Sequence, residues 1–171
     1  MKSTKVSDTY SLKTELVLPN DTNNLGNLMG GKLLHWMDII SAISAQRASR
    51  RTVVTVAVDF VEFKAAIPLG AVVILEARVT RTFHTSLEVR IDVAFESLNT
   101  GERKESNVAY YTFVAVDQSG RPIPVTPIDP ETEEEKQWYE EALYRREMRL
   151  VLAGRLKPQD ANYIKKILGT S

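Results

Sequence analysis

One segment of the chain is apolar around most of a helical circumference. Between Leu28 and Ala48, apolar side chains recur with helical spacing and leave little room for a polar face. They are Leu33, Leu34, Trp36, Met37, Ile39, Ile40, Ala42, Ile43 and Ala45. A helix with apolar residues nearly all round is buried rather than laid on a surface. The remainder of the domain must therefore fold around this one helix.

Strand patterns lie on both sides of the helix. One strand is expected before it, at Tyr10–Leu18, and four after it, at Val53–Phe63, Val72–Thr80, Leu87–Glu96 and Asn107–Val116. The almost continuously apolar Val53–Phe63 is typical of a strand covered on both faces. We expect hairpins to link the four later strands. This order predicts an α+β fold, an antiparallel sheet wrapped around one long buried helix.

The expected strand Leu87–Glu96 alternates cleanly between apolar and polar residues. Its pattern predicts an inward row of Leu87, Val89, Ile91, Val93 and Phe95, and an outward row of Glu88, Arg90, Asp92, Ala94 and Glu96. One face of this strand should therefore pack against the core while the other meets solvent.

The last third of the chain has a different character. A proline-rich passage over residues 117–130 precedes a helical pattern at Glu131–Ala153, which is acidic at its start and basic near its end, as the helix dipole favours. A short amphipathic segment follows at Ala161–Leu168. We therefore predict a main domain over residues 1–127 and a C-terminal helical extension over residues 128–171 that packs on it.

Composition excludes several classes of function. The 22 basic and 22 acidic residues leave no positive excess for binding a nucleic-acid backbone. The absence of cysteine excludes disulfides, thiolate metal sites and a cysteine nucleophile, and two isolated histidines predict no metal site. The apolar stretches are too short to span a membrane and no targeting pattern is visible, so the expected compartment is the cytoplasm.

Candidate chemistry concentrates in Pro19–Asp38, which reads PNDTNNLGNLMGGKLLHWMD. Gly30 and Gly31 lie where the buried helix should begin, and the first N–H groups of a helix point outward as donors at the positive end of its dipole. Such donors suit a carbonyl oxygen that acquires negative charge. Helical spacing places Gly31, His35 and Asp38 on one face. The alternative is that the glycines only permit close packing and this face is a polar stripe exposed to solvent.

Asp38 is the only carboxylate between Asp21 and Asp59. An acid in so apolar a helix could serve as a general base toward water, or it could simply mark a subunit or solvent boundary. Asn23, on the preceding loop, offers an amide donor and acceptor, although asparagine is also a common turn former.

The string P-N-D-T-N-x-x-G-x-x-x-G-G-K-L-L-x-W-M-D, followed by the strand VVTVAVD at Val53–Asp59, resembles the hotdog-fold acyl-CoA thioesterases. These include bacterial short- to medium-chain acyl-CoA hydrolases and the brain and cytosolic acyl-CoA hydrolases of animals. The resemblance covers residues 10–150. It implies a hotdog fold with an added C-terminal helix, hydrolysis of acyl-CoA to a free acid and coenzyme A, and dimers joined edge to edge through their sheets. Trimers of such dimers, and so hexamers, are usual in the family.

The resemblance also implies roles for individual residues. Asp38 matches the catalytic aspartate, as general base or nucleophile, Asn23 the catalytic asparagine, and Gly31 the glycine whose N–H polarises the thioester carbonyl. The asparagine would act with the aspartate of a partner subunit. Leu25 departs from some bacterial relatives, which have a second asparagine there, and His35 matches no catalytic residue and is interpreted as structural. No metal or redox cofactor is implied, because coenzyme A is part of the substrate.

The coenzyme A side would be bound by three groups of residues. In the family, residues matching Val56, Ala57 and Val58 pair with the pantetheine amides, as an added strand would. Residues matching Thr85, Ser86 and Leu87 line the opposite wall, and Arg145 and Arg146 match a basic pair near the nucleotide phosphates. The alternatives are an ordinary hairpin turn and arginines placed only for the helix dipole and solvation.

Two other functions remain to be compared with hydrolysis. A non-catalytic module that only binds acyl-CoA would need neither Asp38 nor Asn23. A hotdog dehydratase needs a catalytic histidine paired with an acid, and His35 lies only three residues from Asp38 on the same helix. Acyl-CoA hydrolysis is therefore the favoured prediction.

Overall fold

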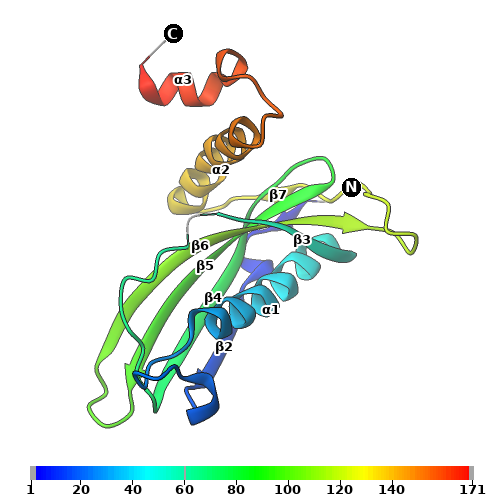
Figure 1. Cartoon of the computed structure of the whole chain (residues 1–171). Helices are drawn as coiled ribbons and strands as arrows, with labels where there is room; N and C mark the ends of the chain where they lie inside the picture. The colour runs from blue at the N-terminus through cyan, green and yellow to red at the C-terminus, as the bar shows by residue number, and fades with distance from the viewer. Residues whose placement is uncertain (1–2, 60, 170–171) are drawn as a thin grey trace. The chain divides into compact units, whose positions relative to one another are not determined.

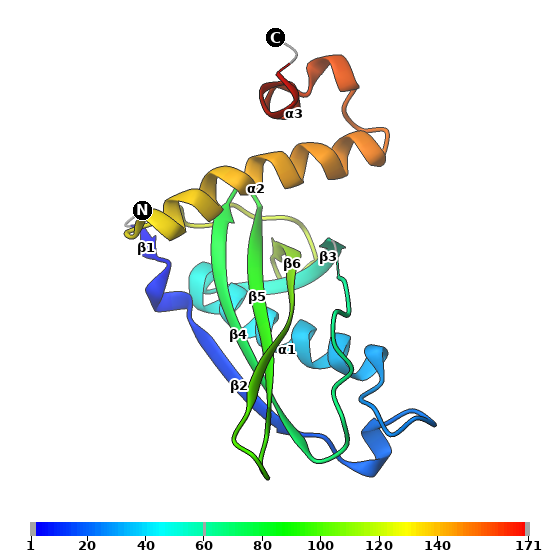
Figure 2. The ribbon, with the colours of Figure 1, turned by 90° about the vertical axis from the view of Figure 1, so that its left-hand side faces the viewer.

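The computed structural model describes residues 3–59 and 61–169. The chain divides between Asp129 and Pro130 into two compact units. The first unit contains a five-stranded antiparallel sheet that curls around the helix α1 (Gly30–Ser49), the arrangement expected from the sequence (Figure 1). Figure 2 views the sheet from its outer side, with α1 behind it.

The strands of the sheet are β2 (Ser11–Leu16), β3 (Thr52–Asp59), β4 (Ala71–Thr82), β5 (Ser86–Ser97) and β6 (Arg103–Val116). Their order across the sheet is β2-β4-β5-β6-β3, and every pair is antiparallel. A separate two-stranded sheet joins β1 (Thr4–Lys5) to β7 (Ile128–Asp129), so part of the passage expected to be only a linker is a short strand. Helix α1 contacts all five strands of the larger sheet.

The position of β3 differs from the sequence prediction. We expected a strand covered on both faces and joined by hairpins to its neighbours, but β3 lies at the sheet edge, beside β6 rather than β4. Val54, Val56 and Val58 are 44%, 55% and 43% exposed. A continuous apolar run predicts that both faces of a strand are buried. It does not show whether residues of the same chain bury them.

Helix α1 is also less enclosed than its sequence predicts. Leu33, Met37 and Ile40 are buried against the sheet, whereas Ile39 and Ile43 are 37% and 41% exposed. The apolar circumference of the helix therefore exceeds what the sheet of a single chain covers.

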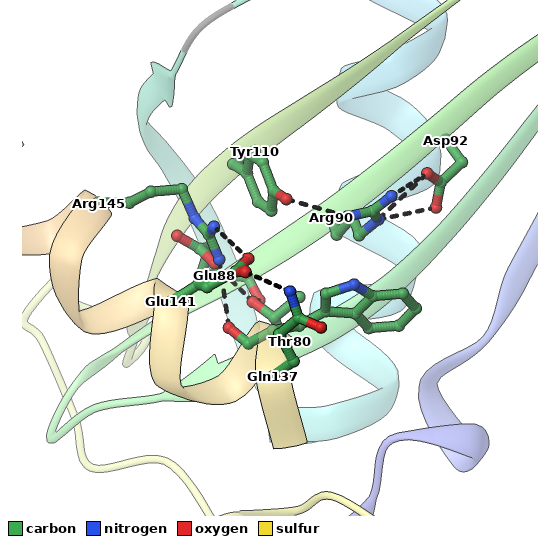
Figure 3. Close-up of polar contacts among 9 residues, drawn as sticks. Thr80, Glu88, Arg90, Asp92, Tyr110, Gln137, Glu141 and Arg145 are labelled. Carbon is green, nitrogen blue, oxygen red and sulfur yellow. Dashed lines mark hydrogen bonds and ion pairs between the residues drawn. The ribbon is translucent and has the colours of Figure 1, made fainter. Parts of the chain in front are cut away.

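The outer face of β5 corrects a second expectation. Glu88 and Ala94, both assigned to solvent, are buried, and the Thr80 hydroxyl donates to a Glu88 carboxylate oxygen at 2.6 Å. Farther along the same face, Arg90 donates to Asp92 at 2.7 Å and to the Tyr110 hydroxyl at 3.0 Å (Figure 3). The alternation along β5 thus identified its two faces correctly. It did not show which residues of the outward face are buried, because that depends on contacts with the rest of the fold.

The second unit is helical, with α2 (Glu133–Leu152) and α3 (Asn162–Leu168). Helix α2 begins with a capping box, in which the Thr132 hydroxyl accepts from the Glu135 N–H and the Glu135 carboxylate accepts from the Thr132 N–H. This cap starts the helix within two residues of the position predicted from its acidic first turn.

Candidate active site

A groove on one side of α1 gathers the residues that the helical spacing placed together. Its cavity volume is about 590 Å³, and its lining consists of Gly31, Leu34, His35, Asp38, Val58, Val61, Phe63 and Tyr111. Gly31, His35 and Asp38 therefore share one face of α1, as their spacing predicts. Strand β6 and the end of β3 supply the facing wall.

Asp38 is the carboxylate of this groove. It is half-buried, and its Oδ1 accepts a hydrogen bond of 2.7 Å from the Thr55 hydroxyl on β3. In the described part of the chain Thr55 is its only hydrogen-bond partner, which leaves Oδ2 available to a ligand or a water molecule. The hydroxyl orients the carboxylate without neutralising it.

A bulge in β3 brings Thr55 and Val58 to the same face of the sheet. Thr55 pairs with Phe113 and Ala57 with Thr112, so Val56 is an extra residue with no counterpart on β6. Without the bulge, residues three apart on a strand would point to opposite faces. With it, Thr55 reaches Asp38 while Val58 lines the same groove.

Tyr111 is a buried side chain in the lining of the groove. Its ring is almost fully buried, and its hydroxyl donates to the Leu34 carbonyl oxygen at 3.2 Å, joining β6 to α1 between Gly31 and Asp38. Burial, and then the nearby charge of Asp38, raises the pKa of Tyr111 to about 12. The phenol therefore remains a neutral donor at neutral pH.

This raised pKa predicts an alkaline loss of stability. The unfolded chain releases the Tyr111 proton near pH 10, whereas the folded chain releases it only near pH 12. Ionisation of Tyr111 should therefore leave the free energy of unfolding independent of pH below pH 10 and lower it as the pH rises from 10 to 12. Denaturant titrations at pH 9 to 12 measure it. The fall should be shallower in Tyr111→Phe but not in Tyr163→Phe, which removes a more exposed phenol. Equal slopes in both variants would contradict the assignment.

Gly31 contributes a backbone donor at the start of α1. Lys32 and Leu33 both bond to the Met29 carbonyl oxygen, whereas within residues 3–59 and 61–169 the Gly31 N–H has no partner. A Cβ built on Gly31 would meet nothing within 4 Å in this chain. Intrachain packing therefore does not require glycine here, and Gly31 lines the open groove that contains Asp38.

Asn23 lies on the loop before α1, in a different hollow from Asp38. Its Oδ1 accepts from the N–H groups of Leu25 and Asn27 at 3.0 and 3.2 Å, so the side chain does form the turn. Among the described residues the Asn23 Nδ2 has no hydrogen-bond partner, so this amide nitrogen can donate to a ligand. Asn23 lines a cavity of about 290 Å³ with Gly30 and Leu33, and Asp38 is absent from that lining.

The residues expected to bind coenzyme A divide into two groups in the first unit. Val56 and Val58 lie exposed on the edge strand β3, and Ala57 beside them is half-buried. Thr85 and Ser86 lie half-buried at the β4–β5 hairpin. In contrast, the Leu87 side chain is fully buried, so only its backbone is open to such a role.

The β pairing relates these two groups. Leu87 on β5 and Thr55 on β3 both pair with Phe113 on β6, the strand between them. They are therefore two strands apart, roughly 10 Å. Residues far apart in the chain thus form neighbouring walls of one end of the sheet.

Arg145 and Arg146 belong to the second unit. Arg145 donates to the Trp138 carbonyl oxygen at 3.2 Å and contacts the Glu141 carboxylate at 3.4 Å. Burial, and then the charges of Arg149 and Arg155, lowers the pKa of Arg146. Two neighbouring arginines thus add positive charge around Arg146, which favours a bound anion.

Tyr111 and Phe63 line the groove and Thr55 holds its carboxylate, but none of the three was singled out from the sequence. Thr55 had one usable signal, as a lone polar residue between valines in a strand expected to be apolar. Tyr111 and Phe63 look like ordinary apolar residues, and only tertiary contacts distinguish them. Among the described residues there is no cluster of three side chains suited to a metal ion, and no helix is long and apolar enough to cross a membrane.

Comparison with known proteins supplies the context for this geometry. Residues 25–100 match the thioesterase superfamily. An uncharacterized acyl-CoA thioester hydrolase of Bacillus subtilis, YkhA, is 44% identical over 134 residues, which cover 78% of each protein. The crystal structure of an apo-hexameric acyl-CoA thioesterase superposes with a TM-score of 0.86 at 43% identity, covering 90% of this chain and 98% of that one.

A third relative has been solved with ligands. The acyl-CoA hydrolase of Staphylococcus aureus, in complex with butyryl coenzyme A, coenzyme A and coenzyme A disulfide, superposes with a TM-score of 0.82 at 29% identity, covering 90% of this chain and 96% of that one. Variants of that enzyme with alanine in place of an aspartate, an asparagine or a threonine have also been solved. Together with the superfamily match and the 44% identical relative, these likenesses show that this chain belongs to the hotdog-fold acyl-CoA thioester hydrolases of the thioesterase superfamily.

Proposed function

We propose that this protein hydrolyses acyl-CoA thioesters to a carboxylic acid and coenzyme A at the groove lined by Gly31 and Asp38, in which the Thr55 hydroxyl holds Asp38. The observation that carries the proposal is the Asp38 carboxylate, held by the Thr55 hydroxyl at 2.7 Å on the helix face that also presents the Gly31 N–H. A base and an oxyanion donor on the same helix face are two groups that thioester hydrolysis requires.

The reaction begins at the free Oδ2 of Asp38. This oxygen removes a proton from water, and the water oxygen attacks the thioester carbonyl carbon. The Gly31 N–H, at the positive end of α1, stabilises the resulting oxyanion. Collapse breaks the carbon–sulfur bond, and the sulfur of coenzyme A takes the proton from Asp38. Direct attack by Asp38 is the alternative, in which coenzyme A leaves first and water then hydrolyses an acyl–Asp38 anhydride. Single-turnover hydrolysis in ¹⁸O-labelled water tests for it, because ¹⁸O enters the Asp38 carboxylate only when water opens that anhydride at the Asp38 carbonyl carbon, whereas general-base catalysis places ¹⁸O only in the acid product.

Asn23 acts as a donor in this scheme. Its Oδ1 is occupied by two backbone N–H groups, so its Nδ2 is the atom that reaches the substrate carbonyl or the attacking water. The substituted asparagine, aspartate and threonine of the Staphylococcus aureus variants are separated by 15 and 17 residues. Asn23, Asp38 and Thr55 have the same separations, which supports a common site.

A second copy of the chain completes the site. Within one chain Asn23 and Asp38 line different cavities, while edge strand β3 and α1 leave Val54, Val56, Ile39 and Ile43 exposed. Pairing two β3 edges about a twofold axis would cover these residues and bring each Asn23 toward the partner's Asp38. The apo-hexameric relative supports three such dimers in one assembly. Residues 56–58 and 85–87 would then bind pantetheine through their backbones.

The experiment that tests the proposal is a thiol-release assay with acyl-CoA substrates from two to sixteen carbons. We expect release of one thiol for each acid formed. Binding of acyl-CoA without release at any length would favour the non-catalytic module instead. The cytoplasmic location expected from the sequence stays a prediction, which cell fractionation tests.

Arg145 and Arg146 should act on the nucleotide rather than on the thioester. Replacing both with alanine should raise the KM for acyl-CoA but not for an acyl-pantetheine lacking the nucleotide. Each lost phosphate contact is worth about 1.5–3 kcal/mol, or roughly 10- to 150-fold. The exposed Lys157→Ala is the control, and equal changes with both substrates would assign the pair to helix stability.

A further inference from the structure

Phe63 borders two cavities at the start of α1. It lines both the groove that contains Asp38 and the smaller cavity that contains Asn23. Its ring lies against Gly30, where an added Cβ would be only 3.2 Å from the Phe63 Cζ. Nothing larger than glycine fits at residue 30 without moving this ring. Phe63, which is 49% exposed, therefore lies at the boundary between the two spaces.

Both apolar side chains and polar groups line the smaller cavity. It measures about 290 Å³ and is lined by Leu28, Leu33, Phe63, Ala65, Ala66 and Ile67, together with Gly30, Asn23 and Asn27. Leu28, Leu33 and Ile67 are each at least nine-tenths buried. The Leu28 N–H donates to the Ile67 carbonyl oxygen at 2.8 Å, which ties the two loops that form the walls. The cavity thus belongs to the ordered fold.

The path between the cavities follows the first residues of α1. Gly31 lines the Asp38 groove and the adjacent Gly30 lines the smaller cavity. A carbonyl oxygen held by the Gly31 N–H therefore has this cavity one residue away, on the far side of the Phe63 ring. A straight aliphatic chain attached to that carbonyl would meet Phe63 before it could enter.

We propose that this cavity receives the aliphatic acyl chain of the thioester and that the Phe63 ring limits the chain length accepted. The inference rests on the proposed hydrolysis of acyl-CoA. It assigns a specificity-determining role to Phe63 and to the small residue Ala65. Removing the ring opens the space, and enlarging Ala65 fills it, so the two changes act in opposite directions.

The test measures kcat/KM for acetyl-, butyryl-, octanoyl-, lauroyl- and palmitoyl-CoA with the full-length protein. We expect Phe63→Ala to raise the lauroyl-to-butyryl ratio of kcat/KM by about tenfold or more, and Ala65→Leu to lower it by a similar factor, the range for a few methylenes in an apolar pocket. Leu98→Ala is the control, because Leu98 is 62% exposed and lines neither cavity. Its ratio should equal that of the wild type.

The possible outcomes separate the inference from the function on which it rests. Unchanged ratios in folded variants that still hydrolyse butyryl-CoA overturn the role of Phe63 and leave hydrolysis intact. No thiol release by the wild-type protein at any length overturns both. If Phe63→Ala does not fold, as judged by circular dichroism, Ala65→Leu decides alone, since it leaves the ring in place and must still shorten the preferred chain.

Discussion

Replacement of Asp38 by alanine or asparagine should lower kcat about 10²- to 10⁴-fold, the usual range for loss of a general base. The change Asp38→Asn is the more informative of the two, because the amide oxygen can still accept from the Thr55 hydroxyl and keep the side chain in place. What the amide cannot do is accept a proton from water. A full loss in Asp38→Asn therefore identifies the chemistry of the carboxylate rather than its position as the cause.

Three further variants separate chemistry from positioning. Thr55→Ala removes the hydroxyl that orients Asp38 and should cost less, about tenfold in kcat, while Thr55→Ser should restore most of the rate. Glu102→Gln, on the exposed β5–β6 turn, is the control for loss of a carboxylate. Each variant should retain its free energy of unfolding to within about 1 kcal/mol. Wild-type turnover by Asp38→Ala would reduce Asp38 to a boundary residue and overturn the mechanism.

Mixing two inactive variants should restore activity if the site is shared between subunits. After subunit exchange between Asn23→Ala and Asp38→Ala chains, each mixed dimer has one site without either residue and one site with both. Random exchange in an equal mixture makes half of the dimers mixed, so about a quarter of all sites should be intact. We expect Asn23→Ala, like Asp38→Ala, to lower kcat at least about 100-fold, so this is a recovery of at least tenfold.

Native mass spectrometry establishes that exchange has occurred before activity is measured. The matched control mixes Asp38→Ala with Asp38→Asn chains, in which no combination contains an intact site. If Asn23 and Asp38 act from the same chain, every site in the first mixture stays damaged. Persistent inactivity after verified exchange would therefore refute the shared site, while leaving the roles of the individual residues to the single variants.

Much of the fold could be predicted because its signals are local. The apolar pattern placed the long helix within two residues of its observed bounds at both ends. The alternation of Leu87–Glu96 identified the core face of β5, where Leu87, Val89, Ile91 and Val93 are fully buried. Both patterns follow from the fixed periods of helix and strand, which any single chain displays in its sequence.

Strand neighbours could not be predicted in the same way. The continuous apolar run at Val53–Phe63 predicted a strand buried on both faces. In the structure β3 lies at the sheet edge beside β6, and its valines are exposed. Which strand lies beside which depends on contacts between residues far apart in the chain, and a pattern within one segment does not encode them. The prediction for the outward row of β5 was wrong at Glu88 and Ala94, which are buried, because alternation separates the two faces of a strand without showing which residues the fold covers.

The features of the candidate site also fall into those that local sequence patterns predict and those that depend on tertiary contacts. The sequence by itself determined that Gly31 and Asp38 share a helix face and that Asn23 precedes that helix, since these relations depend only on helical periodicity and on chain order. Only the tertiary structure decided that Thr55 holds Asp38, that Tyr111 anchors Leu34 and that Phe63 borders two cavities. Each of these contacts joins segments that are separated in the chain, and the bulge at Val56 that aims Thr55 arises from the register of β3 on β6. Register is set by the packing of the whole sheet, so no local pattern contains it.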